Sequence, residues 1–160
     1  MSEKIKILVV DDEVSIREFL EIMLAREGFE VTTVDSPKKA LQLLNASTYK
    51  VVITDISMPE MNGIDLLNQI KQINYEIAVI IITAFGSTES AVEAMKLGAN
   101  DYLTKPFQIA EMKLAIQSAL KSLALEKENR LLRSELGKSF SLENIIGNSA
   151  PMQAVFDLIK

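Results

Sequence analysis

Three aspartates, one threonine and one lysine are the side chains best placed to do chemistry, because each stands where a short apolar run ends. Asp11 and Asp12 follow the first such run, Asp55 closes the third, and Thr83 and Lys105 follow the last two. An aspartate beside a buried run is normally kept at the surface unless a cation meets it. An activated carboxylate can also attack phosphorus and form an aspartyl phosphate. We therefore predict that Asp55 accepts a phosphoryl group.

Crowded carboxylates predict a bound cation. Asp11, Asp12 and Asp55 would repel one another in a single site, so at least one of them should have a raised pKa until a divalent cation binds. Mg²⁺ is the natural choice, because it takes one or two carboxylates, keeps several waters and accepts phosphate oxygens. Phosphoryl transfer depends mainly on positioning and charge neutralisation. The Lys105 ammonium can neutralise the transferring group, and the Thr83 hydroxyl can donate to one of its oxygens.

The composition limits the chemistry further. The 160 residues include no cysteine and no histidine, which excludes disulfides, Fe–S clusters and thiolate zinc sites and removes the commonest acid/base at neutral pH. A phosphohistidine donor must therefore belong to another protein. The formal net charge of −5 disfavours non-specific nucleic-acid binding. The longest apolar run, residues 77–82, is too short to span a bilayer, and the polar start lacks a signal-peptide core, so we expect a cytoplasmic protein without a membrane partner.

Apolar runs alternate with amphipathic segments along most of the chain. Strands are predicted over residues 5–10, 31–34, 51–55, 77–82 and 101–103. Such alternation indicates parallel strands joined by right-handed crossover helices. The fold class is therefore α/β, a doubly wound five-stranded parallel sheet of flavodoxin-like order 2-1-3-4-5, with its switch point between the first and third strands. The carboxyl ends of the strands share one edge of such a sheet, so the five polar side chains should meet there.

Each of these residues also has an ordinary structural explanation. An aspartate at a strand end is often a helix cap, and Thr83 could be a core hydroxyl bonded to backbone. Lys105 alone would be a solvated surface charge, and Tyr102 alone would be a packing residue. The combination, in this order and at these strand ends, favours a functional site.

Four separated motifs resemble the receiver domain of a two-component response regulator over residues 4–123. They are residues 9–13 (VVDDE), residues 55–59 (DISMP) with Asn62-Gly63, Thr83-Ala84, and residues 105–107 (KPF). The resemblance implies that a sensor histidine kinase phosphorylates Asp55. It further implies that Asp11, Asp12, Asp55 and the main-chain carbonyl of Ser57 hold Mg²⁺, and that Thr83 and Lys105 bind the phosphoryl group. It implies a cis Lys105–Pro106 bond, and Tyr102 stands where the family has its rotating aromatic switch residue.

A route from phosphorylation to output follows from neighbouring strand ends. We expect Thr83 to move toward the phosphoryl group and to vacate space that Tyr102 fills. The helix that begins near Ser87 would then be repositioned, with Gly86 as a hinge. The face made by this helix, the strand 101–103 and the last helix is the expected surface of change.

The last helix, predicted to start near Gln108, continues beyond the receiver-like part. Its first apolar residues should pack on the sheet: Ile109, Met112, Ile116, Leu120 and Leu123. Beyond them a 4-3-4 spacing predicts a coiled-coil linker over residues 124–143: Leu125, Asn129, Leu132 and Leu136. An asparagine at an a position favours a parallel dimer of fixed register, so we expect a homodimer through this linker and the face defined above. Gly137 is predicted to end the helix. A solvated amphipathic linker helix is the alternative.

The tail, residues 144–160, resembles the start of the ATPase domain of sigma-54-dependent activators of the nitrogen-regulator class. No G-x-x-x-x-G-K-[ST] loop occurs in the 160 residues, and no helix-turn-helix segment follows. The predicted organisation is a receiver domain (1–123), a dimerisation linker (124–143) and the beginning of an ATPase domain. On this interpretation the chain is regulatory and not an enzyme, beyond catalysing its own phosphorylation and dephosphorylation, and it binds no nucleic acid.

Three rival functions remain at this stage. A magnesium-dependent phosphatase of the haloacid-dehalogenase class needs a second aspartate two residues after the nucleophile, where Ser57 stands, and a nucleophile on the first strand. A nucleotide-binding module needs glycine in the turn at residues 11–15, which has none. A protein-interaction domain that works without phosphorylation would have no need of the acidic cluster.

Overall fold

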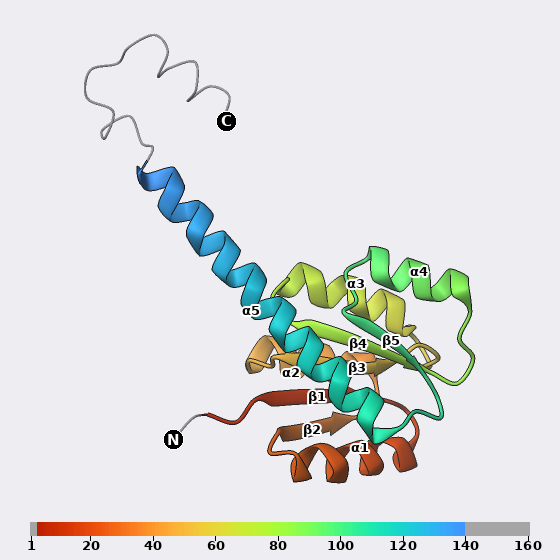
Figure 1. Ribbon diagram of the computed structural model, residues 1–160. Coiled ribbons are helices and arrows are strands. Elements are labelled where there is room, and N and C mark those ends of the chain that lie inside the picture. Colours follow the sequence, from red (N-terminus) through yellow and green to blue (C-terminus); the bar gives the residue numbers. More distant parts are fainter. Residues whose placement is uncertain (1–2, 140–160) are drawn as a thin grey trace, which may run out of the picture. The chain divides into compact units, whose positions relative to one another are not determined.

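Five parallel strands form one sheet in residues 3–139, the part of the chain that this computed structural model describes (Figure 1). The strands are β1 (Lys6–Val10), β2 (Glu30–Val34), β3 (Val51–Asp55), β4 (Ala78–Thr83) and β5 (Asp101–Thr104). Their order in the sheet is β2-β1-β3-β4-β5, and every pairing is parallel. The predicted topology is therefore confirmed.

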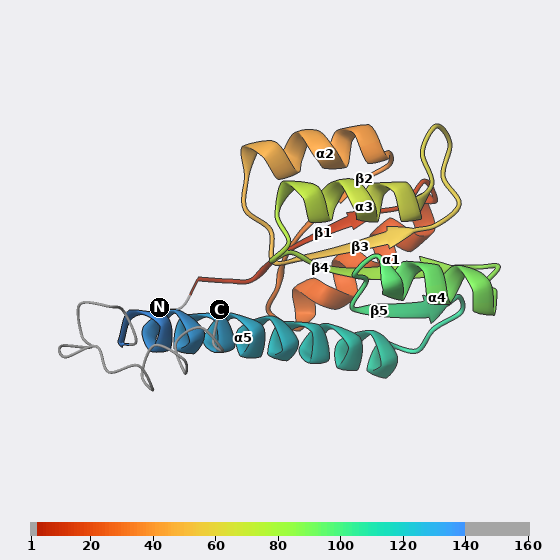
Figure 2. The ribbon, with the colours of Figure 1, turned by 90° about the horizontal axis from the view of Figure 1, so that it is seen from above.

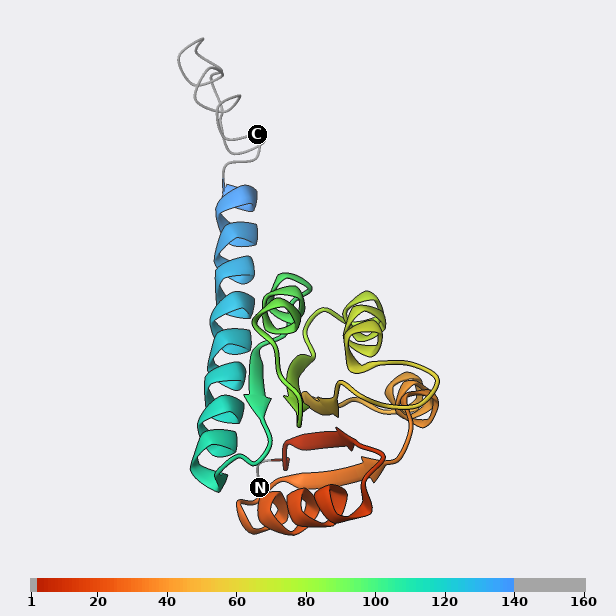
Figure 3. The same cartoon turned by 90° about the vertical axis from the view of Figure 1, so that its right-hand side faces the viewer.

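Helices cover both faces of this sheet. They are α1 (Val14–Arg26), α2 (Pro37–Ala46), α3 (Gly63–Ile73), α4 (Thr88–Lys96) and α5 (Ile109–Ser139). The core beneath α2, α3 and α4 is separate from the core beneath α1 and the first turns of α5. Figures 2 and 3 show the two layers on opposite sides of the strands.

Alternation along the strands explains why the apolar runs are continuous. Leu8 and Val10 of β1 point into the core under α2 and α3, whereas Ile7 and Val9 point into the core under α1 and α5. All four side chains are fully buried. A strand with helices on both faces needs apolar residues at every position, so it shows no polar alternation.

Two expectations for α5 are wrong. Ile109, the first residue of the helix, is 45% exposed, because the apolar stripe turns toward the sheet only at Met112, which is fully buried together with Ile116. The helix also passes through Gly137 and continues to Ser139. A glycine inside a helix costs only about 1 kcal/mol relative to alanine, which the rest of a long helix can offset.

The described chain divides into two units, and the division falls between Leu123 and Ala124 within α5. The predicted beginning of an ATPase domain and the last part of the predicted linker, residues 140–160, lie outside the described residues. No described helix combines the length and apolar character that crossing a bilayer requires.

Candidate functional site

β1 and β3 point toward the same edge of the sheet (Figure 2), and three carboxylates meet at this edge. Asp11 follows β1, Asp12 comes next, and Asp55 is the last residue of β3, the neighbouring strand. Each offers one carboxylate oxygen, and these three oxygens lie within 4.8 Å of one another. Asp11 and Asp55 are buried, whereas Asp12 is exposed. The structure therefore brings the three predicted acids into one open-sided cluster.

Lys105 supplies the positive charge of this cluster. Its Nζ lies 2.9 Å from Oδ2 of Asp11, 3.4 Å from Oδ2 of Asp55 and 3.6 Å from Oε1 of Glu13. The backbone N–H of Lys105 donates to the Thr83 carbonyl at 2.7 Å, which extends the β4–β5 pairing by one residue. The peptide bond from Lys105 to Pro106 is cis. A lysine 94 residues away from Asp11 in sequence is thus held against both buried acids.

Burial raises the pKa values of Asp11 and Asp55, and the nearby Lys105 ammonium opposes this rise. Burial raises the pKa of Asp11, although hydrogen bonds from Lys105 and from the Glu13 backbone oppose the rise. Burial likewise raises the pKa of Asp55 against the attraction of Lys105, and the nearby charge of Asp11 raises it further. Burial disfavours the Lys105 ammonium, but Asp11, Asp55 and Glu13 outweigh that effect and raise its pKa. One lysine therefore does not fully compensate the acids around it.

Thr83 ends β4 on the same edge, one residue beyond the pair that joins Asp55 to Ile82. Its side chain is buried, and its Oγ1 accepts a hydrogen bond from the Phe85 backbone N–H at 3.2 Å. Because the hydroxyl accepts in this contact, its proton stays available to a further acceptor. Thr83 thus ends its strand on the same edge of the sheet as Asp55, and its hydroxyl proton is not used in the contact with Phe85.

Tyr102 lies in β5 and points toward the start of α4. Its hydroxyl is 2.8 Å from Oγ of Ser90, and a methyl group on Gly86 would lie 3.4 Å from its ring. Ser90 is part of a reciprocal capping box with Ser87 at the beginning of α4. The aromatic side chain therefore contacts the helix that the sequence predicts to respond. Nothing in the sequence pattern marks Ser90, the residue that makes this contact.

The turn after β3 is built against the backbone of Asp55. The backbone N–H of Ser57 favours the charged form of the Asp55 carboxyl and opposes the rise of its pKa. The Ser57 residue itself is exposed. Gly63 donates its backbone N–H to the Ile56 carbonyl at 2.8 Å. A Cβ atom on Gly63 would fall against the Asp55 carbonyl oxygen and 2.9 Å from Cα of Ile56. The residue at this position must be glycine for the turn to pack so closely.

The residues present suit a hard divalent cation. Carboxylate oxygens are the ligands that Mg²⁺ and Ca²⁺ prefer, and the three acids could hold such an ion. The exposed side of the cluster, at Asp12, suits Mg²⁺ in particular, since this ion keeps several of its waters.

Comparison with known proteins decides the family. Residues 7–117 match the family described as "Response regulator receiver domain". The chain belongs to this family. It is 38% identical over 150 residues to the Escherichia coli regulatory protein AtoC and 38% identical over 151 residues to the E. coli DNA-binding transcriptional regulator NtrC; both matches cover 94% of this chain. These relatives confirm the likeness to the nitrogen-regulator class, and the chain spans about a third of their length, 32% and 31%.

A solved structure gives the same result. The beryllofluoride-activated NtrC4 receiver domain dimer, determined in solution, matches with a TM-score of 0.71 and 34% sequence identity. The match covers 74% of this chain and 98% of that one. The shared part is thus the receiver domain rather than the second unit.

The predicted dimerisation residues lie in the second unit, which begins at Ala124 and is far in sequence from the three clustered aspartates. Leu125, Leu132 and Leu136 are each more than half exposed, and Asn129 is exposed as well. Leucines at this spacing form an exposed apolar stripe along the described part of α5.

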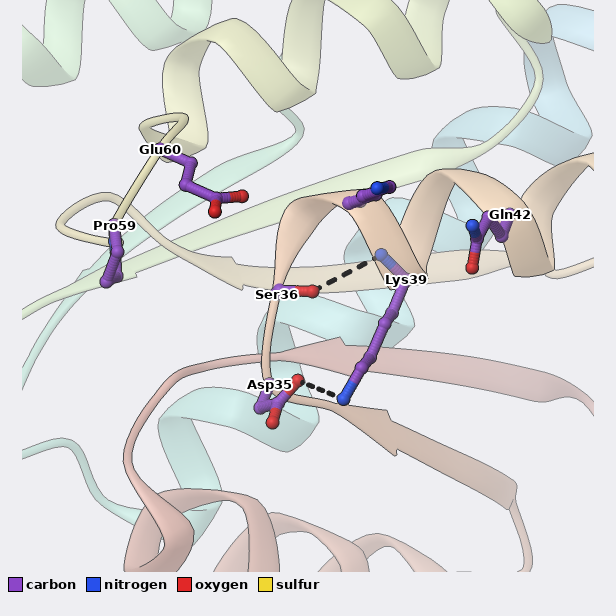
Figure 4. Close-up of a pocket in the computed structure, with 7 residues that line it drawn as sticks. Asp35, Ser36, Lys39, Gln42, Pro59 and Glu60 are labelled. Atoms are coloured by element: carbon purple, nitrogen blue, oxygen red, sulfur yellow. Dashed lines mark hydrogen bonds and ion pairs between the residues drawn. The ribbon is translucent and has the colours of Figure 1, made fainter.

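A separate hollow of about 500 Å³ lies between the start of α2 and the turn after β3 (Figure 4). Lys39 pairs with Asp35 at 2.9 Å and donates its backbone N–H to the Ser36 cap. Glu60 and Pro59 face them from the other side. These are an exposed ion pair and a helix cap, so we assign the hollow no part in the receiver site.

Proposed function

We propose that this chain is the phosphoacceptor part of a two-component response regulator, and that Asp55 takes the phosphoryl group from a phosphohistidine of a sensor histidine kinase. The observation that carries the proposal is the Lys105 ammonium, which contacts two buried carboxylates at the ends of neighbouring strands, at 2.9 and 3.4 Å. A structural ion pair needs one acid. Two buried acids and an exposed third beside one lysine suit a site that receives further charge.

In the proposed reaction, a carboxylate oxygen of Asp55 attacks phosphorus while the bond from phosphorus to the donor imidazole nitrogen breaks. The electron pair of that bond stays on the imidazole, and the product is an acyl phosphate on Asp55. Lys105 holds an ammonium beside the oxygens that gain charge, and Thr83 donates its hydroxyl proton to one of them. Asp11, Asp12, Asp55 and the Ser57 carbonyl would hold Mg²⁺, which when bound supplies neutralisation of the phosphoryl oxygens.

Output would run from Thr83 through Tyr102 to α4. A phosphoryl group on Asp55 adds acceptor oxygens, and Thr83 would exchange its contact with Phe85 for one of them. The hydrogen bond between Tyr102 and Ser90 would transmit the movement of Thr83 and Tyr102 to α4. The face formed by α4, β5 and α5, together with the linker stripe, would then pair with a second copy. The NtrC4 receiver, described as a dimer in its beryllofluoride-activated form, supports this.

For the whole protein we propose a sigma-54-dependent activator, in which the receiver and linker control the protein's own ATPase domain. The matches to AtoC and NtrC support this, since they extend over 94% of the chain and thus beyond residue 117, where the family match ends. The chain itself would be regulatory, with Mg²⁺ as its cofactor and neither ATPase activity nor DNA binding of its own.

The test is phosphorylation of the purified chain by acetyl phosphate, followed by intact-protein mass spectrometry. We expect one added phosphoryl group with Mg²⁺, none after chelation by EDTA and none in Asp55→Asn. Asp65→Asn, an exposed aspartate on α3, is the matched control and should be phosphorylated like wild type. An unmodified wild-type chain would instead favour an interaction domain that works without phosphorylation, and steady turnover of small phosphate esters would favour a phosphatase.

A further inference from the structure

Arg17 holds the backbone that joins two of the candidate cation ligands. Its Nη1 donates a hydrogen bond of 2.7 Å to the main-chain carbonyl of Asp11. That carbonyl belongs to the peptide unit between Asp11 and Asp12. Because a peptide unit is planar, a donor fixed on its oxygen also fixes the direction in which the chain leaves toward Asp12.

Helix α1 begins without the side-chain N-cap that α2, α3 and α4 have. Helices α2, α3 and α4 begin with a side-chain cap, provided by Ser36, Asn62 and Ser87. The residue at the corresponding place before α1 is Glu13, and its side chain makes no cap hydrogen bond. Its carboxylate lies 3.6 Å from the Lys105 ammonium instead. A side-chain cap stabilises the start of a helix. The turn before α1 has no such cap and therefore depends on other contacts.

Those other contacts converge on Asp11. Its backbone N–H donates to the Val34 carbonyl at 3.2 Å, and its Oδ1 accepts from the Glu13 backbone N–H at 2.9 Å. Lys105 occupies Oδ2, and Arg17 occupies the carbonyl. The first three contacts hold the Asp11 residue itself and its link to Glu13. Within residues 3–139, only the contact from Arg17 acts on the peptide unit that leads into Asp12.

We propose that Arg17 is a positioning residue that orients the Asp11–Asp12 turn for divalent-cation binding. The inference rests on the Mg²⁺ site of the proposed function and adds a residue to it. Arg17 touches neither the cation nor the phosphoryl group and acts through the backbone between two ligands. Groups that orient metal ligands in this way typically change metal affinity by about 10- to 100-fold when they are removed.

Charge and positioning make opposite predictions for Arg17→Ala. Removal of a cation next to an acidic cluster would by electrostatics alone strengthen Mg²⁺ binding. Loss of the carbonyl contact would weaken it. The sign of the change in affinity therefore separates the two effects.

The experiment is a Mg²⁺ titration of the 160-residue chain without any phosphoryl donor. Binding is measured from the amide NMR shifts of residues 11–13 and by calorimetry. We expect Arg17→Ala to bind about tenfold more weakly than wild type. Arg17→Lys should recover part of the affinity, because an ammonium can still donate to the carbonyl. Arg26→Ala removes the same charge from the exposed far end of α1 and should bind like wild type.

Unchanged or tighter binding by Arg17→Ala overturns the proposal, and so does an equal loss in Arg26→Ala. If Arg17→Ala does not fold, Arg17→Gln, which keeps a neutral donor, takes its place and should bind more weakly than wild type by a smaller factor. Failure of the wild-type chain to bind Mg²⁺ would remove the proposed site itself. Wild-type binding with an unaffected Arg17→Ala would remove only the role of Arg17.

Discussion

The ammonium group of Lys105 donates a hydrogen bond to Oδ2 of Asp11 at 2.9 Å, and both side chains are shielded from solvent, with 9% and 0% of their surface exposed. Replacement of Lys105 by methionine would leave the Asp11 charge buried without its main partner. We expect the free energy of unfolding at neutral pH to fall by about 3 kcal/mol, as measured by urea denaturation, and phosphorylation from acetyl phosphate to slow strongly.

Lys39→Met is the control for this change. Lys39 forms an ion pair of the same length, 2.9 Å, with Asp35, but both side chains are largely exposed. An ion pair exposed in this way contributes little to stability, so Lys39→Met should lose much less than Lys105→Met. Equal losses in the two variants would show that burial does not set the importance of Lys105.

The raised pKa of Asp55 predicts how stability depends on pH without a divalent cation. A carboxyl group whose pKa is higher in the folded state contributes stability below its ordinary pKa, and this contribution is lost as the pH rises through the raised value. The Asp55 charge therefore opposes folding at neutral pH. Asp55→Asn should melt at a higher temperature than wild type at pH 7, and the difference should shrink as the pH approaches about 4.

Calorimetric melting curves in EDTA across this pH range provide the measurement. Asp65→Asn removes an exposed charge from the first turn of α3 and should give no such gain. A lower melting temperature for Asp55→Asn than for wild type at pH 7 would mean that Lys105 compensates the Asp55 charge fully.

The sheet and the polar edge could be predicted from the sequence, because a strand buried on both faces is visible as an apolar run. The runs ending near Val10, Asp55 and Thr83 correspond to strands, and parallel alternation brings their carboxyl ends together. No long-range contact needed to be known. The family resemblance rests on these same strand-end residues, which is why fold and family were predicted together.

Contacts that depend on side-chain reach could not be predicted. The sequence pattern places Arg17 on the polar side of an amphipathic helix and predicts a solvated charge. In the structure its side chain donates to the Asp11 carbonyl. The sequence predicts that Ser90 is an ordinary helix residue. In the structure its hydroxyl forms a hydrogen bond with the hydroxyl of Tyr102, 12 residues away in sequence. Gly137 is predicted to end the helix, since propensity alone does not show that the long helix before it offsets the cost of a glycine.

Gly63→Ala tests how closely the turn after β3 fits Asp55. The added methyl group would meet the backbone of Asp55 and Ile56, which cannot move aside as a flexible side chain could. We expect a loss of about 2 kcal/mol in the free energy of unfolding together with slower phosphorylation, because the acceptor carboxylate would shift. Gly137→Ala adds the same methyl group where no atom lies within 4 Å and should not destabilise the chain. A stable, normally phosphorylated Gly63→Ala variant would refute this account of the turn.

Tyr102→Ala tests the proposed route to α4. The variant should still bind beryllofluoride at Asp55, because Tyr102 belongs to neither the acid cluster nor its lysine. The amide NMR shifts that beryllofluoride causes in α4 should become much smaller, since the contact to Ser90 is gone. Tyr75→Ala removes an exposed tyrosine that follows α3 and serves as the control. Full α4 shifts in Tyr102→Ala would exclude the aromatic residue from signal transmission.

Leu132→Asp tests the linker stripe. A charge in the centre of a coiled-coil seam is not tolerated, whereas an exposed helix surface accepts it. We expect light scattering to show a dimer for the beryllofluoride-treated wild type and a monomer, or a much weaker dimer, for Leu132→Asp. Leu131→Asp makes the same change one residue away, at a position that the 4-3-4 spacing places outside the seam, and both leucines are more than half exposed. If the two variants behave alike, whether both dimerise or neither does, the stripe does not specify the dimer and the solvated-linker alternative is the better description of residues 124–139.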